Sequence, residues 1–204
     1  MKKKLTVLDI TICAAMIALH IVLELFLTIR IGELYKITLN TLPFVVVGMM
    51  CGPTEGAISG LVGGFLSQML GPYGLMITTP IWIIPGAISG LVSGLLFKGF
   101  KRQPTIVKVA VTVFVAELIT TIYNWFGSYL GDVVILKDMT IEVLIAAIPV
   151  RLVNWAIRSA VFTVVLVPLC KTLLKSCPAG IRQARKNAAA SAAQTPEVTA
   201  QAES

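Results

Sequence analysis

The chain has 204 residues, of which 56% are hydrophobic and only 13% charged, and its mean hydropathy is +0.88. A soluble domain carries about 25% charged residues, and a chain of this length has too little interior to hide so much apolar surface. The composition excludes a soluble globular enzyme, a disordered protein and a nucleic-acid-binding domain. The net charge of +7 is typical of a membrane protein with cytoplasmic lysines and arginines.

Six apolar segments predict an all-α integral membrane protein with six transmembrane helices. The first, 7–29, is longer than the apolar part of a signal peptide, about 7–15 residues, and matches the roughly 20 residues that cross a bilayer. The others are 39–51, 55–70, 77–97, 106–130 and 144–174. Gly52 and Pro53 join the short second and third segments as a tight helical hairpin. An alternative with five spans leaves the second segment re-entrant.

The distribution of positive charge predicts the orientation. With six spans, twelve of the 17 lysines and arginines fall on the side of the two termini, and three fall in the loops on the other side. Both termini are therefore predicted to be cytoplasmic. Residues 1–175 form the predicted membrane domain. Residues 176–204, rich in alanine, glutamine and serine, form a predicted disordered cytoplasmic tail.

One short sequence occurs twice. GAISGLVGG at 56–64 returns as GAISGLVSG at 86–94. Small residues every four positions let helix backbones approach closely in a membrane. The repeat therefore predicts tight packing of helices that run in opposite directions. The four cysteines have no CxxC spacing, which predicts small buried side chains without a disulfide or zinc framework.

Polar residues form one face on each of the last two segments. On the sixth segment this face consists of Arg151, Asn154, Trp155 and Arg158. On the fifth it consists of Glu117, Thr120, Thr121 and Asn124. Glu117 and Arg158 both lie roughly 20 Å below the outer ends of their helices, at 1.5 Å per residue, which predicts an intramembrane ion pair. No carboxylate is expected at the depth of Arg151, so its planar fork is predicted to contact an anionic ligand.

Charged and aromatic residues also gather in the outer loops and at the outer helix ends. Such aromatic residues are typical of a membrane interface, but together they also suit a flat ring in an outward-facing pocket. The predicted substrate-binding residues are Arg30, Tyr35, Lys36, Gln68, Tyr73, Trp82, Asn124, Trp125, Arg151, Asn154 and Trp155. His20 and Glu24, one helical turn apart, predict a polar contact inside the bundle, with a proton relay as the alternative. No catalytic, metal-binding or P-loop motif is found, so the chain is not expected to be an enzyme.

Several motifs resemble those of the substrate-binding S components of energy-coupling-factor (ECF) vitamin transporters, over about residues 5–175. Ala14-Ala-Met-Ile-Ala18 resembles the family's alanine-x-x-x-alanine contact motif. LPFVVVGMMCGPTEG at 42–56 resembles its Pro…Gly…Gly-Pro-x-x-Gly hairpin. The last two helices also resemble the family, at Asn124-Trp125 and at 149–154. The chain is most similar to the folate branch, at Arg30, Pro43, Gly52-Pro53, Asn124 and Pro149-x-Arg151, and departs from it at 64–68 and 77–86.

The resemblance implies a six-helix binding subunit in the plasma membrane of a bacterium. Its partners would be a transmembrane T component and two ATPase subunits, which use the ATP, so that this chain needs no cofactor or metal. Ala14 and Ala18 would form the face against which the T component slides. A folate-like ligand is the first expectation, with pantothenate, riboflavin or a pyrimidine precursor open. The alternatives are a proton-coupled transporter that uses His20, Glu24 or Glu117, and a structural membrane protein without a ligand.

Overall fold

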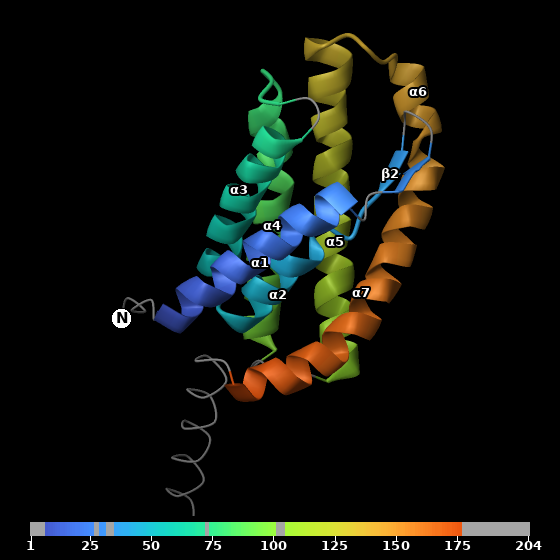
Figure 1. Cartoon of the computed structure of the whole chain (residues 1–204). Helices are drawn as coiled ribbons and strands as arrows, with labels where there is room; N and C mark the ends of the chain where they lie inside the picture. The colour runs from blue at the N-terminus through green and yellow to red at the C-terminus, as the bar shows by residue number, and fades with distance from the viewer. Residues whose placement is uncertain (1–6, 27–28, 32–34, 72–73, 101–104, 177–204) are drawn as a thin grey trace, which may run out of the picture.

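The computed structural model describes residues 7–26, 29–31, 35–71, 74–100 and 105–176. The helices are α1 (Val7–Phe26), α2 (Leu42–Met50), α3 (Pro53–Leu70), α4 (Thr79–Gly99), α5 (Ile106–Ser128), α6 (Ile141–Ala146) and α7 (Ile148–Ser176). A π-helical segment, η1 (Tyr129–Ile135), continues α5, and the strands β1 (Ile29–Ile31) and β2 (Tyr35–Ile37) lie between α1 and α2. Figure 1 shows α3 and α4 on one side of the bundle, α5 and α7 on the other, and α1 crossing in front. The start of α1 and the end of α7 lie at the same end of the bundle.

The short helix α2 forms the centre of the bundle. Every residue from Pro43 to Met50 is buried, and α2 packs against α4, α3, α1 and α7. Its valines and methionines meet apolar side chains of the surrounding helices, among them Phe97, Val113 and Phe162. The helix ends at a turn in which Gly52 has a φ of 143°, a backbone conformation that a side chain would strain. Protein thus encloses α2 along its length.

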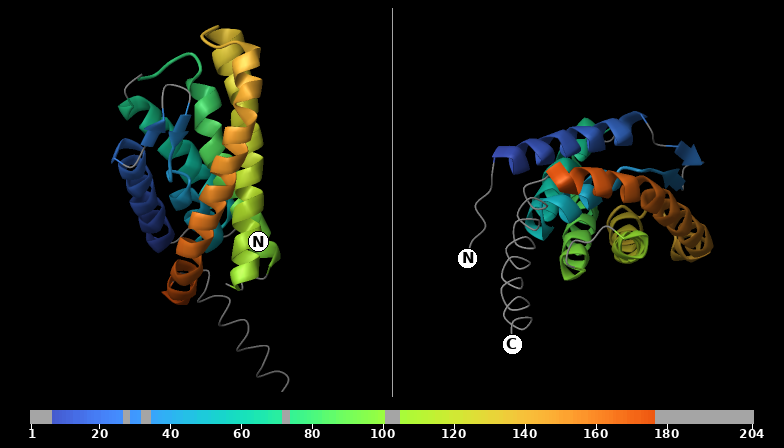
Figure 2. Two further views of the ribbon diagram at one scale, coloured as in Figure 1. Left: turned by 90° about the vertical axis from the view of Figure 1, so that its right-hand side faces the viewer. Right: turned by 90° about the horizontal axis from the view of Figure 1, so that it is seen from below.

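The two copies of the repeated sequence pack against each other. A Cβ atom on Gly60 of α3 would lie 2.2 Å from the carbonyl carbon of Gly86 of α4, and one on Gly90 would lie 2.3 Å from the carbonyl oxygen of Gly56. These two helices share more contacts than any other pair in the described chain, and Figure 2 shows them side by side. The prediction of tight antiparallel packing is confirmed.

The membrane-spanning segments agree with the prediction in part. Within the described residues, four stretches are long and apolar enough to cross a membrane, Val7–Phe26, Thr79–Gly99, Ile106–Ile135 and Ile141–Cys170. The helix α2 is too short, because nine residues rise only about 14 Å. The helix α3 has 18 residues, but its glycines, serines, Glu55 and Gln68 make it less apolar. The third span was therefore predicted at the correct position, but α3 is not apolar enough to be counted among the membrane-spanning helices.

The expected all-α fold needs one correction, because β1 and β2 form an antiparallel hairpin. Arg30 lies opposite Lys36, and Ile31 opposite Tyr35. Isoleucine and tyrosine favour strands, and they alternate with the charged residues here, so the chain leaves the helix after Phe26 rather than at 29. At the other terminus α7 continues to Ser176. The rest of the predicted tail lies outside the described residues.

Candidate functional site

The polar face predicted on the last span packs against α5. Arg158 lies 2.8 Å from the carboxylate of Glu117. Arg151 donates a hydrogen bond from Nη2 to Ser128 Oγ at 2.9 Å. The indole N–H of Trp155 donates to the backbone oxygen of Phe114 at 3.3 Å, and the two rings lie 4.2 Å apart. Three of the four predicted residues therefore bind α5, and the predicted Glu117–Arg158 ion pair is confirmed.

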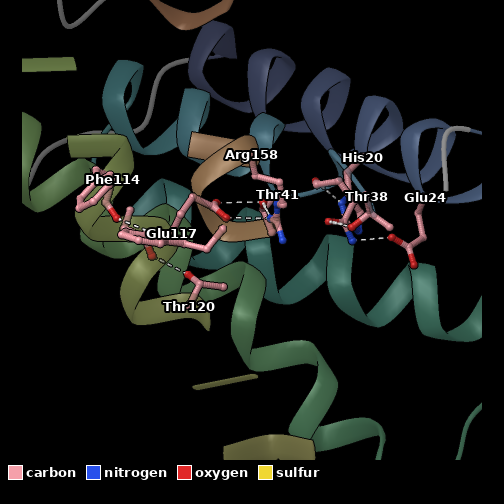
Figure 3. Close-up of polar contacts among 11 residues, drawn as sticks. His20, Glu24, Thr38, Thr41, Phe114, Glu117, Thr120 and Arg158 are labelled. Atoms are coloured by element: carbon pink, nitrogen blue, oxygen red, sulfur yellow. Dashed lines mark hydrogen bonds and ion pairs between the residues drawn. The ribbon is translucent and has the colours of Figure 1, made fainter. Parts of the chain in front are cut away.

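The ion pair has a third member. The hydroxyl of Thr41, just before α2, donates to Glu117 Oε1 at 3.0 Å and accepts a short hydrogen bond from Arg158 Nη2. The Glu117 side chain is 1% exposed and that of Arg158 13% exposed. The guanidinium also stacks over the ring of Phe162, 5.6 Å from its centroid. Figure 3 shows these contacts of Glu117, Thr41 and Arg158. They pair the charge of Arg158 inside the protein, although its buried Nε has no hydrogen-bond partner among the described residues.

The expectation that no carboxylate lies near Arg151 is wrong. Asp132 in η1 interacts with both Ser128 and Arg151. The reason is the length of the fifth helix, which was expected to end near 130 but continues as η1 to Ile135. Ser128 and Asp132 are four residues apart, and this helical spacing was the available signal. The carboxylate of Asp132 therefore offsets part of the positive charge of Arg151.

Two asparagines lie between these two layers of charge. The pairs Glu117–Arg158 and Ser128–Arg151 fix the antiparallel register of α5 and α7, and this register places Asn124 and Asn154 at one level. Both are half-buried. Asn154 Oδ1 and Arg151 Nε are buried and find no hydrogen-bond partner among the described residues. Buried polar atoms are normally satisfied. Arg158 Nε and Ser159 Oγ on the same helix are likewise buried without a hydrogen-bond partner among the described residues.

Residues of α4 reach the same end of the bundle. The half-buried indole of Trp82 lies beside η1, because a Cβ atom on Gly131 would be 3.8 Å from Trp82 Nε1. The structure thus brings Trp82, Asn124, Arg151 and Asn154 to neighbouring helix ends. The other predicted positions are less informative. Gln68 is half-buried on α3 and Trp125 is 37% exposed. Arg30, Tyr35 and Lys36 lie on the hairpin, and Tyr73 lies outside the described residues.

The predicted contact between His20 and Glu24 passes through Asn40. His20 Nδ1 donates to the backbone oxygen of Asn40 at 2.7 Å, and the Asn40 amide donates a short hydrogen bond to Glu24. Thr38 donates to Asn40 Oδ1 at 2.9 Å. The prediction of a polar contact inside the bundle is confirmed. Thr38, Asn40 and Thr41 were missed because they lie in the connection before α2, where no periodicity marks them.

Ala14 and Ala18 occupy an exposed face of α1. The helix packs against α3 and α2 through its other side, where Asp9 and His20 are buried. The alanines keep this outer face flat over one helical turn. Small residues of this kind allow close approach of another membrane helix.

Solved structures with the same fold include FolT bound with folic acid, with 18% identity, a TM-score of 0.63 and coverage of 82% of this chain and 95% of that chain. ThiT from Listeria monocytogenes has 21% identity, a TM-score of 0.62 and coverage of 81% and 94%. A further S component of a bacterial ECF transporter has 18% identity, a TM-score of 0.54 and coverage of 81% and 96%. At these identities the likeness shows the fold alone. Among curated proteins no sequence matches.

The family evidence comes from the sequence of the membrane domain. The family described as ECF-type riboflavin transporter, S component, matches residues 4–175, which include all the helices up to the last turn of α7. The resemblance read from the motifs is therefore confirmed, and the chain belongs to the family of ECF transporter S components.

Proposed function

We propose that this chain captures a vitamin-like molecule on the outer side of a bacterial plasma membrane and delivers it inward together with a T component and two ATPase subunits. The observation that carries the proposal is two buried atoms near the start of α7, Asn154 Oδ1 and Arg151 Nε, in a chain of this family. Neither atom has a hydrogen-bond partner among the described residues. Two observations support six membrane crossings with both termini in the cytoplasm. The start of α1 and the end of α7 lie at the same end of the bundle, and positive charge is concentrated near the termini.

For the substrate we propose a molecule with a flat ring, with riboflavin and folate tested first. The indole of Trp82 offers an apolar face near η1. Asn124 and Asn154 offer both donors and acceptors to ring nitrogens and carbonyl groups. Asp132 offsets the charge of Arg151, so the geometry supports a dianionic folate less strongly than the sequence does. Pantothenate and pyrimidine precursors complete the panel.

A thermal-shift screen of the purified protein tests this function. A ligand at a hundred times its dissociation constant is expected to add about 2.7 kcal/mol to the free energy of unfolding. Asn154→Leu is expected to weaken binding of that ligand about tenfold or more, because it removes a buried hydrogen bond. The matched control is Thr163→Val on the same helix, whose hydroxyl bonds only the backbone oxygen of Ser159 in the described structure. No shift with any compound would contradict the proposed function.

Replacing Ala14 or Ala18 with tryptophan is expected to abolish assembly with the T component while ligand binding stays unchanged. A large ring on this exposed face prevents close helix contact. Co-purification with the tagged T component measures assembly, and the thermal shift measures binding. Leu19→Trp, on the same helix and 40% exposed, is the control because that position is already bulky. Equal yields for all variants would remove the two alanines from the interface.

The proton-coupled alternative gains no support from Glu117, because that carboxylate bonds both Arg158 and Thr41. Uptake by the chain alone, driven by a proton gradient without ATPase subunits, would favour this alternative. A structural protein without a ligand would leave Asn154→Leu and wild type indistinguishable in every assay.

A further inference from the structure

The connection between β2 and α2 binds three long helices through polar groups. We call residues 38–41 the junction. On one side, the backbone oxygen and side-chain amide of Asn40 bond His20 and Glu24 of α1. On the other side, the hydroxyl of Thr41 bonds Glu117 of α5 and Arg158 of α7. Figure 3 shows the two sets of contacts in one row across the bundle.

Apart from the junction, the main contacts of α1 are not with α5 or α7, the helices on the opposite side of the bundle. The main contacts of α1 are with α3 and α2, whereas α5 and α7 contact each other and α4 or α2. Asn40 and Thr41 are consecutive residues, so a movement of one displaces the other. Their partners are charged or buried side chains, and such hydrogen bonds are strong and directional where water is excluded.

The start of α2 makes this link stiff. Thr41 is the residue before α2, and its backbone oxygen accepts hydrogen bonds from the amides of Phe44 and Val45. The helix that follows is buried from Pro43 to Met50, and close-packed interiors transmit displacement rather than absorb it. The junction therefore has a rigid element behind it and charged partners on two sides.

We propose that Asn40 and Thr41 are positioning residues that fix α1 relative to α5 and α7. In terms of the proposed function, on which this meaning rests, they connect the helix with the partner face, Ala14 and Ala18, to the helices with the candidate ligand site. Binding of a partner at α1 then changes the affinity of the site at α7 for its ligand. Ligand binding changes the affinity for the partner by the same factor.

The test measures the distance between α1 and α7 without any ligand or partner. Spin labels are attached at Phe26→Cys and Val164→Cys, which are 80% and 74% exposed, in a full-length chain whose four native cysteines are replaced. Electron double resonance in lipid nanodiscs is expected to give one narrow distance distribution for this parent. Thr41→Val, which keeps the shape of the side chain and removes its hydroxyl, is expected to widen that distribution and shift its mean.

Two variants separate positioning from general loss of structure. Thr41→Ser keeps the hydroxyl and is expected to restore the narrow distribution. Thr120→Val removes a buried hydroxyl of α5 that bonds the backbone oxygen of Ala116, and it is expected to leave the distribution unchanged. A Thr41→Val distribution equal to that of the parent, or one as wide for Thr41→Ser, would overturn the proposal.

A third variant tests the junction through its contact with α1. If Thr41→Val does not fold, Glu24→Leu removes the carboxylate that accepts from Asn40, and the distribution is again expected to widen. An unchanged width would overturn the proposal from this side. Since no ligand enters the measurement, its outcome is independent of the thermal-shift screen that tests the proposed function.

Discussion

Replacing Glu117 with leucine is expected to lower the free energy of unfolding by about 3–5 kcal/mol, because it leaves a buried cation without its counter-charge. Arg158, with a side chain 13% exposed, would keep only the hydroxyl of Thr41 and the ring of Phe162 as partners among the described residues. Arg158→Met is expected to have a similar effect, because it leaves the carboxylate buried. Denaturant titration of the protein in detergent micelles measures both losses.

The double variant Glu117→Leu with Arg158→Met distinguishes charge compensation from packing. Removing both charges avoids the unpaired state, so most of the lost stability is expected to return. Lys98→Met on an exposed position at the end of α4 is the control, and it should change stability by no more than about 0.5 kcal/mol. If the double variant is as unstable as the two losses added together, the pair does not act through its charges.

Gly60→Ala is expected to destabilise the bundle by about 3 kcal/mol, at the upper end of the usual cost of overpacking. The added Cβ would lie 2.2 Å from the carbonyl carbon and 2.3 Å from the carbonyl oxygen of Gly86. Backbone atoms cannot rotate away, so α3 and α4 must separate. The gain of up to about 1 kcal/mol from better helix propensity does not offset this cost.

The control for this variant is Gly99→Ala at the end of α4, where an added Cβ meets nothing within 4 Å. It is expected to be neutral or slightly stabilising. The melting temperatures of the two variants in the same detergent provide the comparison. Equal melting temperatures would show that the contact between the two repeats tolerates a methyl group.

Features with a regular spacing could be predicted from the sequence. The third apolar segment was expected at 55–70 and forms α3 at Pro53–Leu70, because the turn residues Gly52 and Pro53 mark its start. The Glu117–Arg158 pair followed from helix rise and register alone. The contact between the two glycine repeats followed from their small residues every four positions. The ion pair and the glycine contact thus follow from helical periodicity, and the start of α3 follows from its turn residues.

Features that depend on irregular backbone could not be predicted. Asn40 and Thr41 bond side chains on α1, α5 and α7 from a connection without periodicity. Asp132 interacts electrostatically with Arg151 because the backbone continues past Ser128 as a π-helix. The spacing of Ser128 and Asp132 hinted at this continuation, but composition does not reveal the π-helix itself. Arg151 was assigned to an anionic ligand because no carboxylate was expected near it. The carboxylate of Asp132 weakens that assignment.

The enclosed position of α2 has a consequence for biosynthesis. A helix that rises about 14 Å is roughly half as long as the hydrocarbon core is thick. The last carbonyl groups of such a helix would face lipid if it inserted alone, and unsatisfied backbone groups are costly there. Its main neighbour, α4, is made later by the ribosome. The α2 segment must therefore wait at the translocon or the membrane surface until α3 and α4 emerge, and it enters the bilayer as part of their assembly.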